Sequence, residues 1–174
     1  MLQTKTRYKS MSRVKIKEKI YEVTFDHELM VTTVFQKVDY QDCFEVHING
    51  FKTVDFFVKK YFLAQPLWLR VVSFQLFSRD LLVQQLEENR FKKGDSIGAW
   101  RVYGRDDQEI AFGQDLGFME YVFTFHLVSP DLLKVATVVQ YKGVWGKYYF
   151  NVVKFFHKPF VRLSLKNTLV RDKR

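Results

Sequence analysis

The chain has 174 residues, of which 47% are hydrophobic and 17% aromatic, and its net charge is +9. This length suits about one domain, and three prolines and eight glycines are too few for a linker-rich or disordered chain. One cysteine, Cys43, excludes an internal disulfide framework, and no apolar run approaches the ~18 residues of a membrane-spanning helix.

The positive charge is concentrated at the two ends of the chain. Residues 1–20 carry +6 and residues 154–174 carry +6, so the remainder is mildly acidic at −3. A nucleic-acid-binding protein normally carries its positive charge on the working face, interleaved with aromatic residues. The distribution therefore disfavours nucleic acid. It fits a basic tail with a solvated helix back, an anionic membrane surface or an acidic partner.

Residues 1–25 are expected to be a basic N-terminal extension, partly ordered, ahead of a single domain formed by residues 26–174. Residues between Val14 and Val23 could add a short edge strand. The start of the chain lacks the apolar core of a secretory signal. Together with the lone cysteine, which fits a reducing compartment, this predicts a cytoplasmic protein.

The first clear element is a strand over residues 39–48. Residues 28–37 before it are apolar but fit neither a helical nor a strand period. The strand itself alternates, and its apolar side is formed by Tyr40, Phe44, Val46 and Ile48. Asn49-Gly50 then indicates a turn.

Two helices are expected after this strand. Thr53 is a typical N-cap residue, and its helix would run to about Leu63. The inward side of that helix is predicted to hold Val54, Phe57, Val58, Tyr61 and Phe62. Pro66 suits the first turn of a second helix that ends near Gln85 and is apolar on most sides. Residues 87–95 then form a loop.

From Ser96 onward the pattern is typical of an antiparallel meander. Strands are expected over residues 97–105, 109–114, 118–128 and 132–142, with turns at 105–108, 115–117 and 129–131. In the third strand the apolar side holds Met119, Tyr121, Phe123, Phe125 and Leu127.

The chain closes with a helix predicted from Trp145 to Val170, roughly 37 Å long. Seven apolar side chains fall on one arc of about 160°: Tyr149, Phe150, Val153, Phe156, Phe160, Val161 and Leu163. The opposite side carries Lys154, Lys158, Arg162 and Lys166, with Phe155 out of place among them. Pro159 predicts a kink or a break, and His157 lies within the apolar arc.

A strand, two helices, an antiparallel meander and a long helix predict an α+β domain with the helices on one face of the sheet. A curved sheet wrapped around the last helix would enclose an apolar cavity at one end, where small ligands bind.

Three stretches resemble a bacterial domain family of unknown function. They are residues 40–48 (YQDCFEVHI), residues 94–128 and residues 154–165 (KFFHKPFVRLSL). The recurring positions are Gly94-Asp95, Ile97-Gly98, Trp100-Arg101-Val102, Asp115 and Phe156-His157. Members of that family occur alone or fused behind NAD-dependent epimerase-like dehydrogenases. The family is grouped with the START-like, birch-pollen-allergen-like helix-grip proteins, which include polyketide cyclases and lipid carriers. The resemblance implies a helix-grip fold with a cavity and a dehydrogenase as a candidate partner, but no established chemistry.

The candidate ligand-binding residues are Trp100, Tyr121, Phe123, Phe125, Tyr141, Tyr149, Val153 and His157. The aromatic residues among them would either line a pocket or fill a dry core. His157 is the candidate catalytic residue, as an acid or a base, or else a buried histidine bonded to a strand or loop. Its apolar position predicts a lowered pKa unless an acid lies near it.

Other side chains carry weaker signals. Asp115 either caps a tight turn or faces the cavity mouth, and Arg101 is either a solvated strand residue or an anchor for an acidic ligand group. No histidine has a metal-ligand spacing, so no metal or cofactor is expected. The sequence contains no GxGxxG, P-loop, GxSxG or HExxH motif.

Three functions fit these patterns. The favoured one is a non-catalytic binder of a small apolar or aromatic molecule, including a lipid. The second is a cyclase or dehydratase that moves a proton with His157, Tyr121 or Tyr141. The third is a module that docks on a membrane surface or a partner through its basic ends and Phe155.

Overall fold

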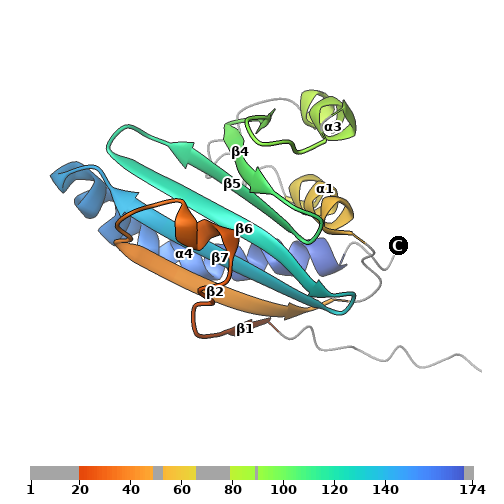
Figure 1. The fold of residues 1–174 in the computed structure, drawn as a ribbon, viewed down its shortest axis with the longest axis horizontal. Helices are drawn as coiled ribbons and strands as arrows, with labels where there is room; N and C mark the ends of the chain where they lie inside the picture. The colour runs from red at the N-terminus through yellow and green to blue at the C-terminus, as the bar shows by residue number, and fades with distance from the viewer. Residues whose placement is uncertain (1–19, 49–52, 66–78, 89, 171–174) are drawn as a thin grey trace, which may run out of the picture.

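A computed structural model of the chain describes residues 20–48, 53–65, 79–88 and 90–170. Seven antiparallel strands form one curved sheet in the order β1-β2-β7-β6-β5-β4-β3 (Figure 1). The strands are β1 Ile20–Glu22, β2 Tyr40–His47, β3 Ser96–Ile97, β4 Trp100–Arg105, β5 Glu109–Asp115, β6 Met119–Ser129 and β7 Leu132–Tyr141. The helices are the 3-10 helix η1 Met30–Thr33, α1 Val54–Ala64, α3 Arg79–Glu88 and α4 Val144–Val170. The predicted α+β class, with a long C-terminal helix, is confirmed.

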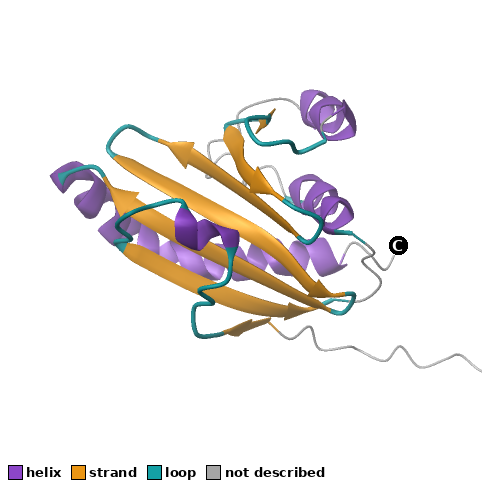
Figure 2. Ribbon diagram, in the orientation of Figure 1, coloured by secondary structure: helices purple, strands orange, loops and turns teal. Residues whose placement is uncertain are grey.

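The two faces of the sheet are covered by different parts of the chain. Figure 2 shows α4 on one side of the sheet and η1 on the other. The face towards α4 is called the helix face below. The segment that contains η1, residues 23–38, is called the strap, and the face beneath it the strap face. Strand alternation divides the side chains between the two faces, because successive residues point to opposite sides.

The helix face carries the large aromatic core. Phe44, Phe57, Phe62, Phe112 and Phe125 are each completely buried in one cluster with α1 and the C-terminal half of α4. Phe125 packs against Phe57 and Tyr61 at ring-centroid distances of 5.6 and 4.7 Å. This cluster fixes α1 on the sheet.

The strap face carries a core of small residues. Ala111, Ala136, Val138 and Cys43 are buried there beneath Leu29 and Val31 of the strap. The strap also approaches the sheet backbone closely. A Cβ added at Gly104 would lie 2.3 Å from the sulfur of Met30, so a residue without a side chain suits this position.

Glu109 fastens the strap to the sheet. Both of its carboxylate oxygens accept hydrogen bonds from the Met30 N–H, at 2.9 and 3.1 Å, and the Thr124 hydroxyl donates to Oε1 at 2.7 Å. Burial raises the pKa of Glu109, against the hydrogen bonds from Thr124 and Met30, which lower it. The short η1 helix thus begins on a buried carboxyl group of a neighbouring strand.

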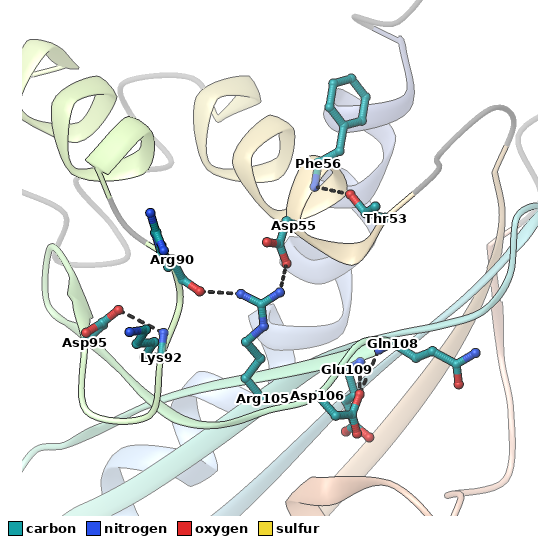
Figure 3. Close-up of polar contacts among 10 residues, drawn as sticks. All are labelled: Thr53, Asp55, Phe56, Arg90, Lys92, Asp95, Arg105, Asp106, Gln108 and Glu109. Atoms are coloured by element: carbon teal, nitrogen blue, oxygen red, sulfur yellow. Dashed lines mark hydrogen bonds and ion pairs between the residues drawn. The ribbon is translucent and has the colours of Figure 1, made fainter.

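Arg105, at the end of β4, joins two segments to the hairpin of β4 and β5 (Figure 3). Its Nη2 lies 3.1 Å from Asp55 Oδ1 of α1, and its Nη1 donates to the carbonyl of Arg90. The cap of α1 is as predicted, because the Thr53 hydroxyl accepts from the Phe56 N–H at 3.3 Å.

Most predicted boundaries hold, with two exceptions in the described residues. The strand expected over residues 97–105 is divided into β3 and β4 by a turn at Gly98, which has a positive φ of 60°. Helix α3 continues to Glu88, two residues into the expected loop. The start of the second helix near Pro66, the Asn49-Gly50 turn and residues 1–19 lie outside the described residues.

A kink or a break was predicted at Pro159; there is no break, because α4 runs through this residue as one helix. The part of it that is buried also differs from the expected arc. Phe156 is 69% exposed, whereas Ser164, Leu165 and Thr168 are completely buried. Compared with the predicted orientation, the helix is rotated about its axis so that part of its basic side faces the sheet near β1.

Two of the four basic side chains predicted to be solvated instead contact the edge of the sheet. Arg162 donates to the Ile20 carbonyl at 2.9 Å and lies over the Phe44 ring at 5.2 Å. Lys158 forms an ion pair with Glu22. With these contacts in place the basic side of α4 faces β1, and Phe156 points outward. Among the described residues, no helix is long and apolar enough to cross a membrane.

Candidate functional site

A cavity of about 210 Å³ lies between the helix face and α4. Its sheet wall includes Trp100, Gln114, Tyr121, Phe123, Thr137 and Val139. Its helix wall includes Tyr149, Val153, Phe156, His157, Phe160 and Ser164. The walls are mostly apolar, and the aromatic rings of the sheet keep α4 away from the backbone at this level.

The structure brings six of the eight predicted binding residues together around this cavity, namely Trp100, Tyr121, Phe123, Tyr149, Val153 and His157. The other two lie elsewhere. Phe125 is fully buried beneath α1, and Tyr141 packs against Phe150 at a centroid distance of 5.8 Å. Strand alternation placed both on the correct face, but it does not say how far along the strand the cavity extends.

The polar atoms of the sheet wall bind one another. The Trp100 indole N–H donates to the Tyr121 hydroxyl at 2.8 Å, and this hydroxyl donates to Gln114 Oε1 at 3.0 Å. Burial raises the pKa of Tyr121 to about 12. Tyr121 therefore remains a neutral phenol near pH 7, and its hydroxyl is already used within the wall.

The end of the cavity next to α1 offers an unused acceptor. The Gln65 side-chain amide donates to the Tyr61 carbonyl at 2.8 Å, while its Oε1 is buried with no hydrogen-bond partner among the described residues. Tyr61 and Ser164 line the same end. Burial raises the pKa of Tyr61 to about 12, and the nearby Ser164 hydroxyl opposes this shift.

Gln65 was not predicted as a site residue, because the residue before Pro66 was interpreted as the end of a helix. One feature of the sequence could have identified it. Gln65 is an uncharged polar residue directly after an apolar helix, whereas an exposed residue at such a position more often carries a charge. Its buried amide now forms part of the cavity wall.

His157 lies on the helix wall with an acid behind it. Its Nε2 is 3.1 Å from Asp42 Oδ2, and Asp42 Oδ2 also accepts from the Tyr40 hydroxyl at 2.7 Å. The side chain of Asp42 is 2% exposed, and its Oδ1 has no hydrogen-bond partner among the described residues. Burial, followed by the bond to Asp42, raises the pKa of Tyr40.

From the sequence, an acid near His157 was allowed for but not identified. That acid is Asp42. It occupies the apolar side of β2 together with Tyr40 and Phe44. An acid on the apolar side of an alternating strand is the signal that could have identified it, because buried carboxylates need partners.

The remaining candidate residues are not among the residues that line the cavity. Asp115 Oδ1 accepts from the Gly117 N–H at 2.8 Å and Oδ2 lies 2.6 Å from Lys142 Nζ, which lowers the pKa of Asp115. Arg101 is exposed on β4. Burial beneath the strap raises the pKa of the Cys43 thiol to about 11. Within the described residues no group of three or more His, Cys, Asp or Glu side chains is placed to hold a metal ion.

Comparison with known proteins gives one match. No curated protein and no solved structure matches the chain. The family described as "Protein of unknown function (DUF2867)" matches residues 34–164, which include the strands and helices that surround the cavity. Because this match covers most of the chain, the protein belongs to that family of unknown function.

Proposed function

We propose that the protein binds a small, largely apolar molecule with one or two rings in the cavity between the sheet and α4. The observation that carries this proposal is the cavity itself, with a volume of about 210 Å³ and mostly apolar walls. An apolar protein cavity of about 150 Å³ binds benzene. The present cavity therefore suits a substituted ring or a fused pair of rings better than a long-chain lipid.

The chemistry of the walls favours a neutral ligand with a hydrogen-bond donor. No Lys, Arg, Asp or Glu occurs among the described residues that line the cavity, and an unpaired buried charge is costly. Gln65 Oε1 is an acceptor in need of a donor. A phenolic hydroxyl at the α1 end of the cavity would satisfy this oxygen.

Calorimetric titration with 2-naphthol tests the proposal. We expect 2-naphthol to bind more tightly than 2-methoxynaphthalene, because the latter has no donor for Gln65. Val153→Phe should abolish binding by filling the cavity. The matched control is Val152→Phe, at a neighbouring position that is 63% exposed, and it should bind like the wild type. Equal binding by the two variants contradicts the proposed site. Equal binding of the two naphthalenes contradicts the proposed hydrogen bond to Gln65.

The pair of His157 and Asp42 favours a second candidate function, a dehydratase or cyclase acting in the same cavity. His157 faces the cavity and a buried carboxylate lies behind it, which is an arrangement that can hold and move a proton. Native mass spectrometry of the wild type and of His157→Gln tests this. A dehydratase predicts bound molecules that differ by the mass of one water. Identical bound masses would leave simple binding as the function.

A further inference from the structure

The first half of α4 exposes a continuous band of large apolar side chains. Trp145 is 79% exposed, Phe155 72% and Phe156 69%. We define the aromatic stripe as Trp145, Tyr148, Tyr149, Val152, Phe155 and Phe156. At 3.6 residues per turn these six side chains occupy one arc of about 120°.

The stripe has a basic flank. Lys147 and Lys154 are exposed on the same helix and lie about 80–100° beyond the edge of the arc that Phe155 forms. The flexible side chain of Lys154 brings its ammonium to 5.7 Å from the centre of the Phe155 ring. Helix α4 contains no Asp or Glu over its 27 residues. In the adjacent turn, the carboxylate of Asp115 is paired with Lys142. The helix that carries the stripe is therefore positively charged.

Packing among the residues that the structure describes does not bury the stripe. Figure 1 shows that α4 starts at the end of the sheet away from α1 and α3, so neither of these helices covers it. A contiguous exposed apolar patch with a polar rim marks a binding surface. Here Trp145 and Phe155 face water, and the buried aromatic core on the helix face does not include any ring of the stripe.

We propose that the aromatic stripe binds the surface of an anionic lipid bilayer. Tryptophan and tyrosine are enriched at the level of lipid headgroups, and amphipathic helices with an apolar face beside lysines lie in that interface. Each lysine near an anionic surface adds about 1 kcal/mol of attraction. A second copy of the chain fits less well, because α4 has no acidic residue to pair with the basic residues of another α4.

The position of the stripe also concerns the cavity. Tyr149 and Phe156 belong to the stripe and to the cavity wall. A bilayer bound at the stripe therefore lies next to the cavity, and an apolar ligand could pass between them. This last step depends on the proposed function, whereas bilayer binding by the stripe does not.

Co-sedimentation of the full chain with vesicles tests the docking surface. We expect binding to vesicles of 30% phosphatidylserine in phosphatidylcholine, weak binding to pure phosphatidylcholine, and loss of binding in 0.5 M NaCl. The double variant Trp145→Ser with Phe155→Ser should weaken binding at least about tenfold. Lys147→Glu with Lys154→Glu should do the same. Neither pair includes a residue of the cavity wall.

Matched controls separate the stripe from the general basic charge of the chain. Phe56→Ser removes an aromatic ring of α1 that is 54% exposed, and Lys92→Glu with Lys93→Glu reverses two exposed charges far from the stripe. Both should bind like the wild type. If the stripe variants bind as well as these controls, or if the wild type does not bind anionic vesicles, the proposal is wrong.

Two measurements address the depth of binding and the alternative occupant. Quenching of Trp145 by brominated phosphatidylcholine, mixed with 30% phosphatidylserine, should disappear in Trp145→Phe, which still binds. Unchanged quenching in this variant would contradict insertion of Trp145. Sedimentation velocity without lipid should give a monomer. A dimer that Trp145→Ser with Phe155→Ser dissociates would overturn the proposal in favour of a second copy.

Discussion

The two faces of the sheet are covered by side chains of very different size. On β5, Phe112 points to the helix face and its neighbour Ala111 to the strap face, and on β6 and β7 Phe125 and Ala136 do the same. Small side chains allow the strap to lie directly on the strands, as the contact of Met30 with Gly104 shows. Large rings hold α4 at a distance and leave a cavity between them. One sheet thus supports a closely packed face and a face with space inside.

The largest expected effect is on the helix face. Phe125→Ala should lower the free energy of unfolding by about 3–5 kcal/mol, because it removes a fully buried ring from the contact with α1. Phe123→Ala should cost less, since Phe123 borders existing space. Urea denaturation measures both. Equal losses would mean that Phe123 is packed as tightly as Phe125, which contradicts the cavity.

A smaller effect is expected from adding volume on the strap face. Ala136→Leu should lower the free energy of unfolding by about 1–3 kcal/mol, because the completely buried Ala136 has no space for a larger side chain beneath the strap. Val139→Leu, which extends into the cavity, should cost under about 1 kcal/mol. Thermal and urea unfolding of the two variants compare the faces directly.

Two threonines test whether hydroxyl groups have the same role on both faces. Thr124 is completely buried and donates to Glu109, so Thr124→Val should cost about 1–2 kcal/mol. Thr137 faces the cavity, and Thr137→Val should change stability by about 0.5 kcal/mol or less. The opposite ranking would show that the polar anchor of the strap contributes little.

The smallest effect concerns the pH dependence of stability. The folded protein holds the proton of Glu109 to a higher pH than the unfolded chain, whose glutamate pKa is about 4.3. The contribution of this residue to the free energy of unfolding therefore falls as the pH rises from 4.3 to the raised pKa, and then stays constant. Of the nearby charged groups, His126 lowers the pKa of Glu109 and Asp106 raises it.

Glu109→Gln should remove this part of the pH dependence. The stability of the wild type minus that of the variant should decrease between pH 4 and pH 7, as urea unfolding at several pH values will show. A difference that increases with pH would mean that hydrogen bonds, rather than burial, dominate the pKa of Glu109.

The sequence predicted the fold because its elements are periodic. The alternation in β2 and the meander, the cap at Thr53 and the long final helix each identify an element from local residues alone. The strap has no such period, since within residues 28–37 only Met30–Thr33 form a short 3-10 helix, which is held by Glu109 from far along the chain. Local pattern carries no information about such a contact.

The candidate site was predicted in part for the same reason. Alternation identified the aromatic side of the sheet, and six of the eight residues border the cavity. The rotation of α4 depends on Glu22 and the Ile20 carbonyl, which lie more than a hundred residues earlier. A helical projection uses only the residues of the helix itself and not these distant partners. The prediction therefore placed Phe156 on the buried side.

Cys43 gives the strap a chemical reporter. It is the one cysteine of the chain, it is completely buried, and its thiol remains protonated near neutral pH because its pKa is about 11. A disulfide reagent such as Ellman's reagent can reach this sulfur only when the strap lifts from the sheet or the whole domain unfolds. Where labelling is faster than unfolding of the whole domain, its rate therefore measures the opening of the strap alone, and no label has to be introduced into the protein to follow it.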